Sequence, residues 1–309
     1  MNKIPIIVIG GPTASGKTSL SIDLAKQFDT EIISCDSMQI YKYMNIGTAK
    51  PDMEERDGIV HHMLDIIEPS TPYSVAEFVS DTHKITQTIH EKGKVPVAVG
   101  GTGLYINSLI NDVDFREDDS SPKLRKELEE LEKEKGIDYL VDMLKSFDVV
   151  SAERIHKNNK RRIIRAIEFY KMTGVPISVH QEETRKKISR YNPCMMAIKW
   201  DMQKLYERIE KRVDIMLDMG LVDEVKSLCE KGYTESMLSM QGIGYKEIIA
   251  YLNGEVSLDE AIYNIKIGTR HYAKRQMTWF NKDERVNWIN YDEDILKKAN
   301  EIIEKWGGI

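Results

Sequence analysis

Residues 4–18 of the chain read Ile4-Pro5-Ile6-Ile7-Val8-Ile9-Gly10-Gly11-Pro12-Thr13-Ala14-Ser15-Gly16-Lys17-Thr18. An apolar run of strand type ends in a glycine turn, and a helical pattern begins at Thr18. The spacing G-x-x-x-x-G-K-T is that of a phosphate-binding loop between a strand and a helix. Glycines let successive N–H groups converge on phosphate oxygens, and the helix N-terminus adds its positive dipole end. Lys17 supplies a cation, and Thr18 can hold Mg²⁺ through its hydroxyl. A chance glycine turn is the alternative, which this context disfavours.

Bulk properties limit the class of protein. The 309 residues suit one large domain or two smaller ones, and 41% apolar with 30% charged residues can form a sizeable core. No apolar run reaches the length of a membrane span, and we expect the apolar run at 4–9 to be a buried strand, because it lacks the basic stretch and longer apolar core of a signal peptide. Three well-separated cysteines, Cys35, Cys194 and Cys229, fit a reducing compartment and exclude a CxxC-type zinc site. We expect a cytoplasmic protein.

Apolar runs alternate with helical patterns along the chain. Besides residues 4–9, runs at 31–34, 62–66, 95–99, 195–200 and 286–290 predict strands. Helical patterns at 75–91, 203–219, 222–231, 245–252 and 258–280 separate or follow them. This order predicts an α/β fold of the P-loop NTPase type, with a mostly parallel sheet flanked by helices.

The composition changes between residues 113 and 190. This segment has no strand pattern, and it carries charged helical patterns at 123–135, 138–146 and 161–172. We therefore expect a catalytic core formed by residues 1–112 and 191–309, and an all-helical insertion over residues 113–190.

Two further polar features follow predicted strands. Asp36 comes after the run at 31–34, where it could act as a general base, bind Mg²⁺ or cap a turn. Thr102 lies in a second glycine turn, residues 100–103, after the run at 95–99. Ligands of parallel sheets gather beyond the carboxyl ends of the strands, so both positions should lie near the phosphate-binding loop. The run at 95–99 lacks the terminal aspartate of a Walker-B strand, which disfavours simple nucleotide hydrolysis.

Basic residues cluster although the net charge is −6. The first cluster lies in the insertion and comprises Lys157, Lys160, Arg161, Arg162 and Arg165, with Arg185, Lys186, Lys187 and Arg190 nearby; the second comprises Arg270, His271, Lys274 and Arg275. Either cluster could be a solvated helix face. No acidic residue interrupts the first over residues 157–165, which favours contact with a phosphate backbone. The second leads into Trp279 and Phe280, and basic residues beside aromatics suit an unstacked base and its flanking phosphates. Arg208 and Arg212, one helical turn apart, could hold an anion or pair with Glu207 or Glu210.

An ordered set of motifs resembles one family, the tRNA dimethylallyltransferases (tRNA isopentenyltransferases) of bacterial type. The motifs are GGPTASGKT at 10–18, DSMQIY at 36–41, NIGTAKP at 45–51, HHMLD at 61–65, VGGTGLY at 99–105, NKRRIIRA at 159–166, QGIGY at 241–245 and KRQMTW at 274–279. The resemblance covers nearly the whole chain. It implies transfer of a dimethylallyl group from dimethylallyl pyrophosphate to N6 of adenosine 37, in tRNAs that read codons beginning with U.

The resemblance also implies roles for particular residues. Asp36 matches the general base, with Lys17 and Thr18 in catalytic positions and Thr18 on Mg²⁺. The pyrophosphate would contact Gly11, Pro12, Thr13, Ala14, Ser15, Gly16, Lys17, Thr18 and Arg212. The anticodon stem-loop would contact Cys35, Asp36, Ser37, Met38, Thr102, Arg125, Asn159, Lys160, Arg161, Arg162, Ile163, Gln241, Lys274 and Arg275, with the insertion gripping the RNA. The implied partners are tRNA and dimethylallyl pyrophosphate, with Mg²⁺ as cofactor. We expect the protein to bind no membrane, to need no obligate protein partner and to be a monomer.

Three other functions fit parts of the sequence. The phosphate-binding loop by itself points to ATP and permits a small-molecule kinase. The prenyl group could instead go to a free adenine nucleotide, although the basic insertion disfavours this. A non-catalytic RNA-binding module would leave Lys17, Thr18 and Asp36 without a purpose.

Overall fold

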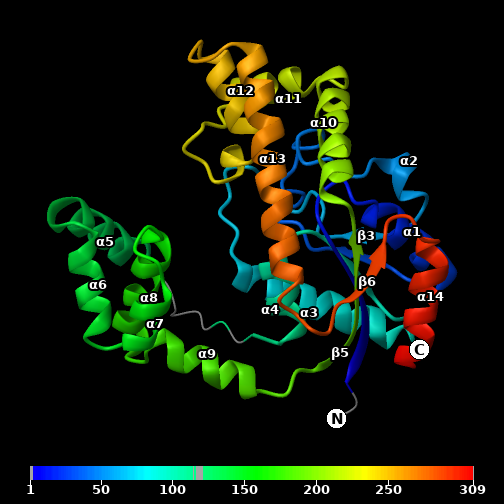
Figure 1. The fold of residues 1–309 in the computed structure, drawn as a ribbon, viewed down its shortest axis with the longest axis horizontal. Coiled ribbons are helices and arrows are strands. Elements are labelled where there is room, and N and C mark those ends of the chain that lie inside the picture. The colour runs from blue at the N-terminus through cyan, green and yellow to red at the C-terminus, as the bar shows by residue number, and fades with distance from the viewer. Residues whose placement is uncertain (1–2, 114, 116–120, 309) are drawn as a thin grey trace. The chain divides into compact units, whose positions relative to one another are not determined.

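The computed structural model describes residues 3–113, 115 and 121–308. The chain divides into two compact units (Figure 1). The first comprises residues 1–110 and 189–309, and the second comprises residues 111–188. We call them the α/β unit and the helical unit. The limits expected from the sequence differ from these by two residues at each boundary.

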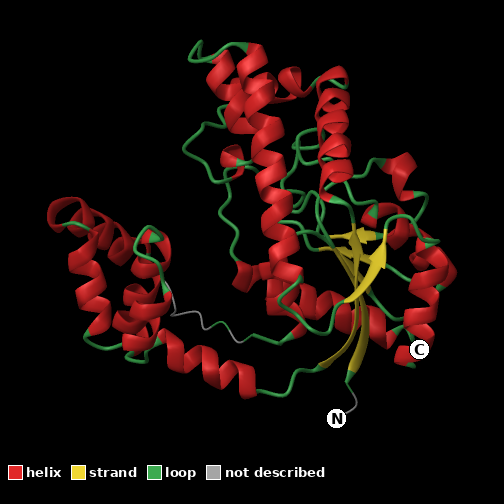
Figure 2. Ribbon diagram, in the orientation of Figure 1, coloured by secondary structure: helices red, strands yellow, loops and turns green. Residues whose placement is uncertain are grey.

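The α/β unit is built on a six-stranded sheet (Figure 2). In sequence order its strands are β1 (Ile4–Gly10), β2 (Ile32–Ser34), β3 (His61–His62), β4 (Val97–Val99), β5 (Tyr191–Lys199) and β6 (Asn287–Asn290). The spatial order is β3-β2-β4-β1-β5-β6, and every pairing is parallel. The predicted P-loop-type α/β fold is confirmed.

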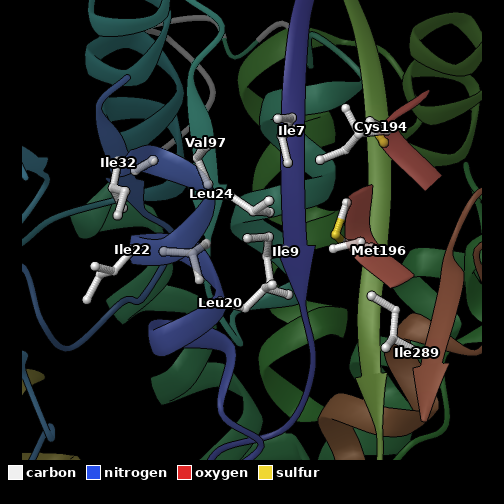
Figure 3. Close-up of a cluster of buried hydrophobic side chains, with 14 of the residues drawn as sticks. Ile7, Ile9, Leu20, Ile22, Leu24, Ile32, Val97, Cys194, Met196 and Ile289 are labelled. Atoms are coloured by element: carbon white, nitrogen blue, oxygen red, sulfur yellow. The ribbon is translucent and has the colours of Figure 1, made fainter. Parts of the chain in front are cut away.

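The centre of the sheet is buried on both faces. Ile7 and Ile9 of β1 pack with Leu20 and Leu24 of helix α1 (Lys17–Gln27), and with Met196 of β5 (Figure 3). Successive side chains of a strand point to opposite faces, so the equally buried Ile6 and Val8 lie on the other side of the sheet. This two-sided burial explains why β1 is an uninterrupted apolar run. It also holds the end of β1, from which the phosphate-binding loop starts.

The remaining helices of the α/β unit flank the sheet or extend beyond it. They are α2 (Met53–Arg56), α3 (Val75–Glu91), α4 (Gly103–Ile110), α10 (Met202–Asp218), α11 (Leu221–Glu230), the 3₁₀ turn η2 (Ser239–Gln241), α12 (Tyr245–Leu252), α13 (Leu258–Phe280) and α14 (Ile295–Trp306). A second apolar core joins α10 to α13 and includes Val213, Leu221, Tyr245 and Ile265. No helix in the described part of the chain is long and apolar enough to span a membrane.

The helical unit contains α5 (Pro122–Lys135), α6 (Ile137–Lys145), α7 (Val149–Arg154), α8 (Lys160–Thr173) and α9 (Ile177–Lys186). Its own core includes Leu128, Leu140 and Ile167. Ser121 caps α5 by accepting a hydrogen bond from Leu124 N, and Pro122 occupies the first turn, where its missing N–H is harmless. The described residues of this unit form helices and no strand.

Some predicted elements differ from the structure for identifiable reasons. The strand expected at 62–66 is limited to His61–His62, because Met63 and Asp65 have positive φ values of 66° and 55°. Helix α9 was not predicted, because none of its described residues is buried and it therefore has no apolar stripe. Helix α7 has only six residues, too few for a periodic pattern.

Candidate active site

The phosphate-binding loop has the backbone its sequence predicts. Gly11 and Gly16 have φ values of 134° and 91°, which favour glycine, and Ala14 has a φ of 62°. Gly16 is the N-cap of α1. Lys17 Nζ donates to Pro12 O at 3.0 Å, so the lysine folds back over the loop. A chance turn is excluded by this geometry together with the strand and helix on either side.

Side chains from distant parts of the chain fix the loop from outside. Arg208 Nε donates to Ala14 O at 2.9 Å, and Trp200 Nε1 donates to Ser15 O at 3.0 Å. The Arg208 guanidinium lies 4.5 Å from the centre of the Trp200 ring, so the two donors support each other. Because N–H and C=O point in opposite directions in a trans peptide, the N–H groups of Ser15 and Gly16 are directed away from these two side chains.

Gln276 on α13 connects the loop to the neighbouring glycine turn. Its Oε1 accepts from Thr13 N at 2.9 Å, and its Nε2 donates to Gly101 O at 3.0 Å. Gln276 is only 4% exposed. A Cβ on Gly101 would come within 2.0 Å of Gln276 Nε2, so this close approach requires glycine.

A cavity of about 430 Å³ lies at the carboxyl ends of the strands. Its polar lining includes Thr13, Lys17, Thr18, Asp36, Arg212 and Arg275, and its apolar lining includes Leu64, Val213, Met216, Ile243 and Ile265. The cavity thus combines a phosphate-binding loop and a carboxylate with an apolar wall. Such a lining suits a ligand that carries both a phosphate and a hydrocarbon group.

Asp36 follows β2 and is held in a tight turn. Its Oδ1 accepts from Met38 N at 2.8 Å and from Gln39 N at 3.3 Å. The turn is also tied to the second glycine turn, because Ser37 N donates to Thr102 Oγ1 at 3.2 Å. Oδ2 accepts no hydrogen bond from the described residues, and Asp36 lines the cavity. The turn-capping and basic roles considered from the sequence are therefore compatible.

Burial and neighbouring charge shift three pKa values in the cavity. Burial, together with the Arg212 charge, lowers the pKa of Lys17 from 10.5 to about 8, although the Asp36 carboxylate opposes this. Burial likewise lowers the pKa of Arg212. Burial and the Asp36 charge raise the pKa of Tyr272 to about 12. Two cations without a full counter-charge leave the site ready for an anion.

Several residues expected to contact RNA are exposed. In the α/β unit Lys274 and Arg275 are exposed on α13, and Gln241 lines the cavity. In the helical unit Asn159, Lys160, Arg161 and Arg162 are exposed. Lys160 forms an ion pair with Glu132, whereas Arg161 and Arg162 form none with the described residues.

Other residues assigned to binding from the sequence are buried or have structural partners. The side chains of Cys35 and Ile163 are 0% and 1% exposed, so any RNA contact at these positions would involve the backbone. Arg125 donates to both carboxylate oxygens of the buried Glu168, at 3.1 and 2.9 Å, which ties α5 to α8. Arg208 supports the loop carbonyl described above, and its expected partner Glu210 pairs with Arg270.

Comparison with known proteins agrees with this geometry. A family model described as IPP transferase matches residues 39–283, and one described as isopentenyl transferase matches residues 4–67. The chain belongs to the IPP transferase family. The family resemblance expected from the motifs is thereby confirmed.

Curated relatives of this IPP transferase family member align with it over nearly its whole length. The tRNA dimethylallyltransferase of Acetivibrio thermocellus is 57% identical over 288 residues, which are 93% of this chain and 92% of that protein. The tRNA dimethylallyltransferase of Lachnoclostridium phytofermentans is 50% identical over 304 residues, 97% of each chain.

Solved structures of the family are also similar. The tRNA isopentenylpyrophosphate transferase of Bacillus halodurans has a TM-score of 0.74 at 42% identity, covering 100% of this chain and 96% of that one. A eukaryotic dimethylallyltransferase described as acting on tRNA has a TM-score of 0.85 at 30% identity, covering 98% of this chain and 80% of that one.

Three residues at the site were given no role from the sequence: Gln276, Trp200 and Tyr272. Gln276 lies 263 positions from its partner Thr13, and Trp200 lies 185 positions from Ser15. No local spacing links such pairs. Gln276 does lie inside the family motif at 274–279, which was the only available signal.

Proposed function

We propose that this member of the IPP transferase family transfers a dimethylallyl group from dimethylallyl pyrophosphate to N6 of adenosine 37 in tRNAs that read codons beginning with U. Pyrophosphate is the second product. The observation that carries the proposal is the cavity that joins a phosphate-binding loop, the Asp36 carboxylate and an apolar wall. The high identity to proteins named tRNA dimethylallyltransferase supports it.

The pyrophosphate of the donor would occupy the phosphate-binding loop. The residues assigned to it are Gly11, Pro12, Thr13, Ala14, Ser15, Gly16, Lys17, Thr18 and Arg212. Thr13 N is already engaged by Gln276, so the N–H groups of Ser15 and Gly16 and the first turn of α1 are the available backbone donors. These donors and two cations stabilise the charge that develops as pyrophosphate leaves. The apolar wall is the place for the hydrocarbon group.

Asp36 is the proposed general base. The lone pair of N6 is delocalised into the adenine ring, so the amine is a poor nucleophile. A C–N bond forms to the first carbon of the dimethylallyl group as the C–O bond to pyrophosphate breaks, and Asp36 takes the N6 proton. Two backbone N–H groups hold its Oδ1, which leaves Oδ2 as the atom to receive that proton.

A divalent metal suits this site through the substrate. The described residues contain no cluster of three or more histidine, cysteine, aspartate or glutamate side chains that could hold a metal alone. Thr18, which lines the cavity beside Lys17, would hold Mg²⁺ together with phosphate oxygens and water, as this ion prefers. When bound, Mg²⁺ supplies positive charge to the departing pyrophosphate.

The RNA partner is the anticodon stem-loop of tRNA. The target base must leave its stack to reach Asp36. Exposed Lys274 and Arg275 on α13, and Arg161 and Arg162 on α8, are available for phosphate contacts. We assign RNA binding to the helical insertion on this basis. We also propose that the enzyme acts in the cytoplasm, without an obligate protein partner and as a monomer.

One assay tests the reaction. Protein, Mg²⁺ and labelled dimethylallyl pyrophosphate are mixed with unmodified tRNA or with AMP. Label in tRNA and not in AMP is the expected result. Label in AMP alone would assign the protein to free nucleotides, and label in neither would refute prenyl transfer. Transfer of phosphate from γ-labelled ATP to a small acceptor would support a kinase instead.

A further inference from the structure

One wall of the active-site cavity is a loop without regular structure. Residues 45–49 connect the Asp36 region to α2, and Gly47, Thr48 and Ala49 line the cavity. A loop of this kind needs partners for its backbone polar groups. Here the partners come from a helix remote in sequence.

Glu224 on α11 accepts the N–H groups of three successive loop residues. Its Oε2 accepts from Asn45 N at 2.9 Å and from Ile46 N at 2.8 Å, and its Oε1 accepts from Gly47 N at 3.0 Å. The Tyr245 hydroxyl donates to the same Oε1 at 2.7 Å. Four donors on one carboxylate form a set of charge-assisted hydrogen bonds.

This arrangement occupies what would otherwise be an anion site. Successive N–H groups that converge on one point form a nest for anions. The carboxylate of Glu224 occupies this nest, so the three N–H groups are not available to a substrate anion. The Tyr245 ring closes the loop from the side, because a Cβ on Gly47 would lie 2.4 Å from that ring.

The far end of the loop is tied to the proposed base. Gln39 Nε2 donates to Thr48 O at 3.3 Å and to Ala49 O at 3.2 Å. The backbone N of the same Gln39 donates to Asp36 Oδ1 at 3.3 Å. These hydrogen bonds, together with the covalent backbone of residues 45–49, connect Glu224 through Gln39 to Asp36.

We propose that Glu224 is a positioning residue for prenyl transfer: by fixing residues 45–49 it holds Gln39, and through Gln39 it orients the Asp36 carboxylate. Glu224 does not line the cavity. The inference rests on the proposed function for its kinetic part. A small displacement of a base costs a large part of its catalytic effect.

The test compares Glu224→Gln with Asp223→Asn. Glutamine keeps the shape but offers one acceptor oxygen, and its NH₂ group faces N–H groups of the loop. Asp223 is an exposed neighbour on the same helix, so its variant is a control for the change of charge. For Glu224→Gln we expect kcat to fall roughly ten- to hundredfold, with the KM for dimethylallyl pyrophosphate within about threefold. Asp223→Asn should behave as wild type.

Hydrogen exchange and a double-mutant cycle separate positioning from other effects. The amides of residues 45–47 should exchange faster in Glu224→Gln than in Asp223→Asn, whatever the activity. Adding Glu224→Gln to Gln39→Ala should change kcat by no more than about twofold, because the two act in series. If Glu224→Gln does not fold, Tyr245→Phe is the substitute, because it removes one hydrogen bond to the Glu224 carboxylate. It should also lower kcat with little change in KM, by a smaller factor.

Each outcome is decisive. An active wild type together with an unchanged kcat in Glu224→Gln would overturn the positioning role, as would fully additive effects with Gln39→Ala or unchanged exchange at residues 45–47. An inactive wild type would instead overturn the proposed function. The two failures are therefore distinguishable.

Discussion

Replacing Lys17 with methionine should stabilise the α/β unit at neutral pH while weakening pyrophosphate binding. Burial lowers the pKa of Lys17 from 10.5 to about 8, which means that the folded protein holds this positive charge at a cost. The difference is about 2.5 pKa units, or roughly 3 kcal/mol of unfolding free energy. The anion-binding role proposed for Lys17 is therefore expected to lower the free energy of unfolding.

The sign of the pH dependence follows from proton linkage. Between about pH 8 and pH 10.5 the unfolded chain binds a proton at Lys17 that the folded chain has lost, so the Lys17 contribution to the free energy of unfolding rises with pH across this window. Below about pH 8 the lysine is protonated in both states, and the full cost remains. Lys17→Met has no such group, so its advantage over wild type should shrink by roughly 3 kcal/mol from pH 7 to pH 10.5.

Urea unfolding followed by tryptophan fluorescence measures the difference in unfolding free energy between the two proteins, and it reports on the α/β unit. The four tryptophans, Trp200, Trp279, Trp288 and Trp306, all lie in the α/β unit. Comparing the variant with wild type at each pH cancels the titration of the groups that do not interact with Lys17. A difference between the two proteins that does not change with pH would refute the reasoning. Pyrophosphate with Mg²⁺ should stabilise wild type more than Lys17→Met.

Three further variants test other parts of the molecule. Asp36→Asn should lower kcat about a hundred- to ten-thousandfold in the prenylation assay, with tRNA affinity measured by fluorescence anisotropy unchanged; near-normal turnover would remove Asp36 as the base. Gln276→Met leaves Thr13 N and Gly101 O without their partner, so the free energy of unfolding should fall by about 2–4 kcal/mol and the KM for the prenyl donor should rise. The control is Gln87→Met on an exposed helix face, which should change neither quantity. The double variant Arg161→Gln with Arg162→Gln should weaken tRNA binding. The slope of log affinity against log salt concentration should become shallower by one to two, roughly 0.7–0.9 for each lost phosphate contact. An unchanged slope would show that these arginines do not contact the RNA backbone.

The sequence predicted those features whose causes are local. The backbone of the phosphate-binding loop follows from Gly11 and Gly16, whose positive φ values other residues rarely adopt. Helix α3 begins where the sequence indicates, because Ser74 and Glu77 form a capping box at its first turn. The apolar run of β1 predicts a buried central strand, and the structure places β1 between β4 and β5.

Features that depend on tertiary contacts were not predictable in this way. Nothing near Arg208 in sequence indicates that its partner is the carbonyl of Ala14, 194 positions away, in place of Glu207 or Glu210. Ile163 lies on the apolar face of α8, which indicates a core position, and it is buried. Its assignment to RNA contact came from the family resemblance and not from this pattern. Glu224 gave no signal, because its role depends on three backbone N–H groups and not on any side-chain motif.

The outward support of the phosphate-binding loop bears on the chemistry of the site. Trp200 and Arg208 donate hydrogen bonds to the carbonyl oxygens of Ser15 and Ala14, and Lys17 donates one to that of Pro12. The peptide dipoles are thus oriented before any ligand binds, so little reorganisation is needed when charge develops. A cradle of this kind stabilises a diphosphate whether phosphorus or carbon is transferred. In the proposed reaction, what directs transfer to carbon is the rest of the cavity: the apolar wall, where the hydrocarbon group would lie, and Asp36, the proposed base for the attacking amine.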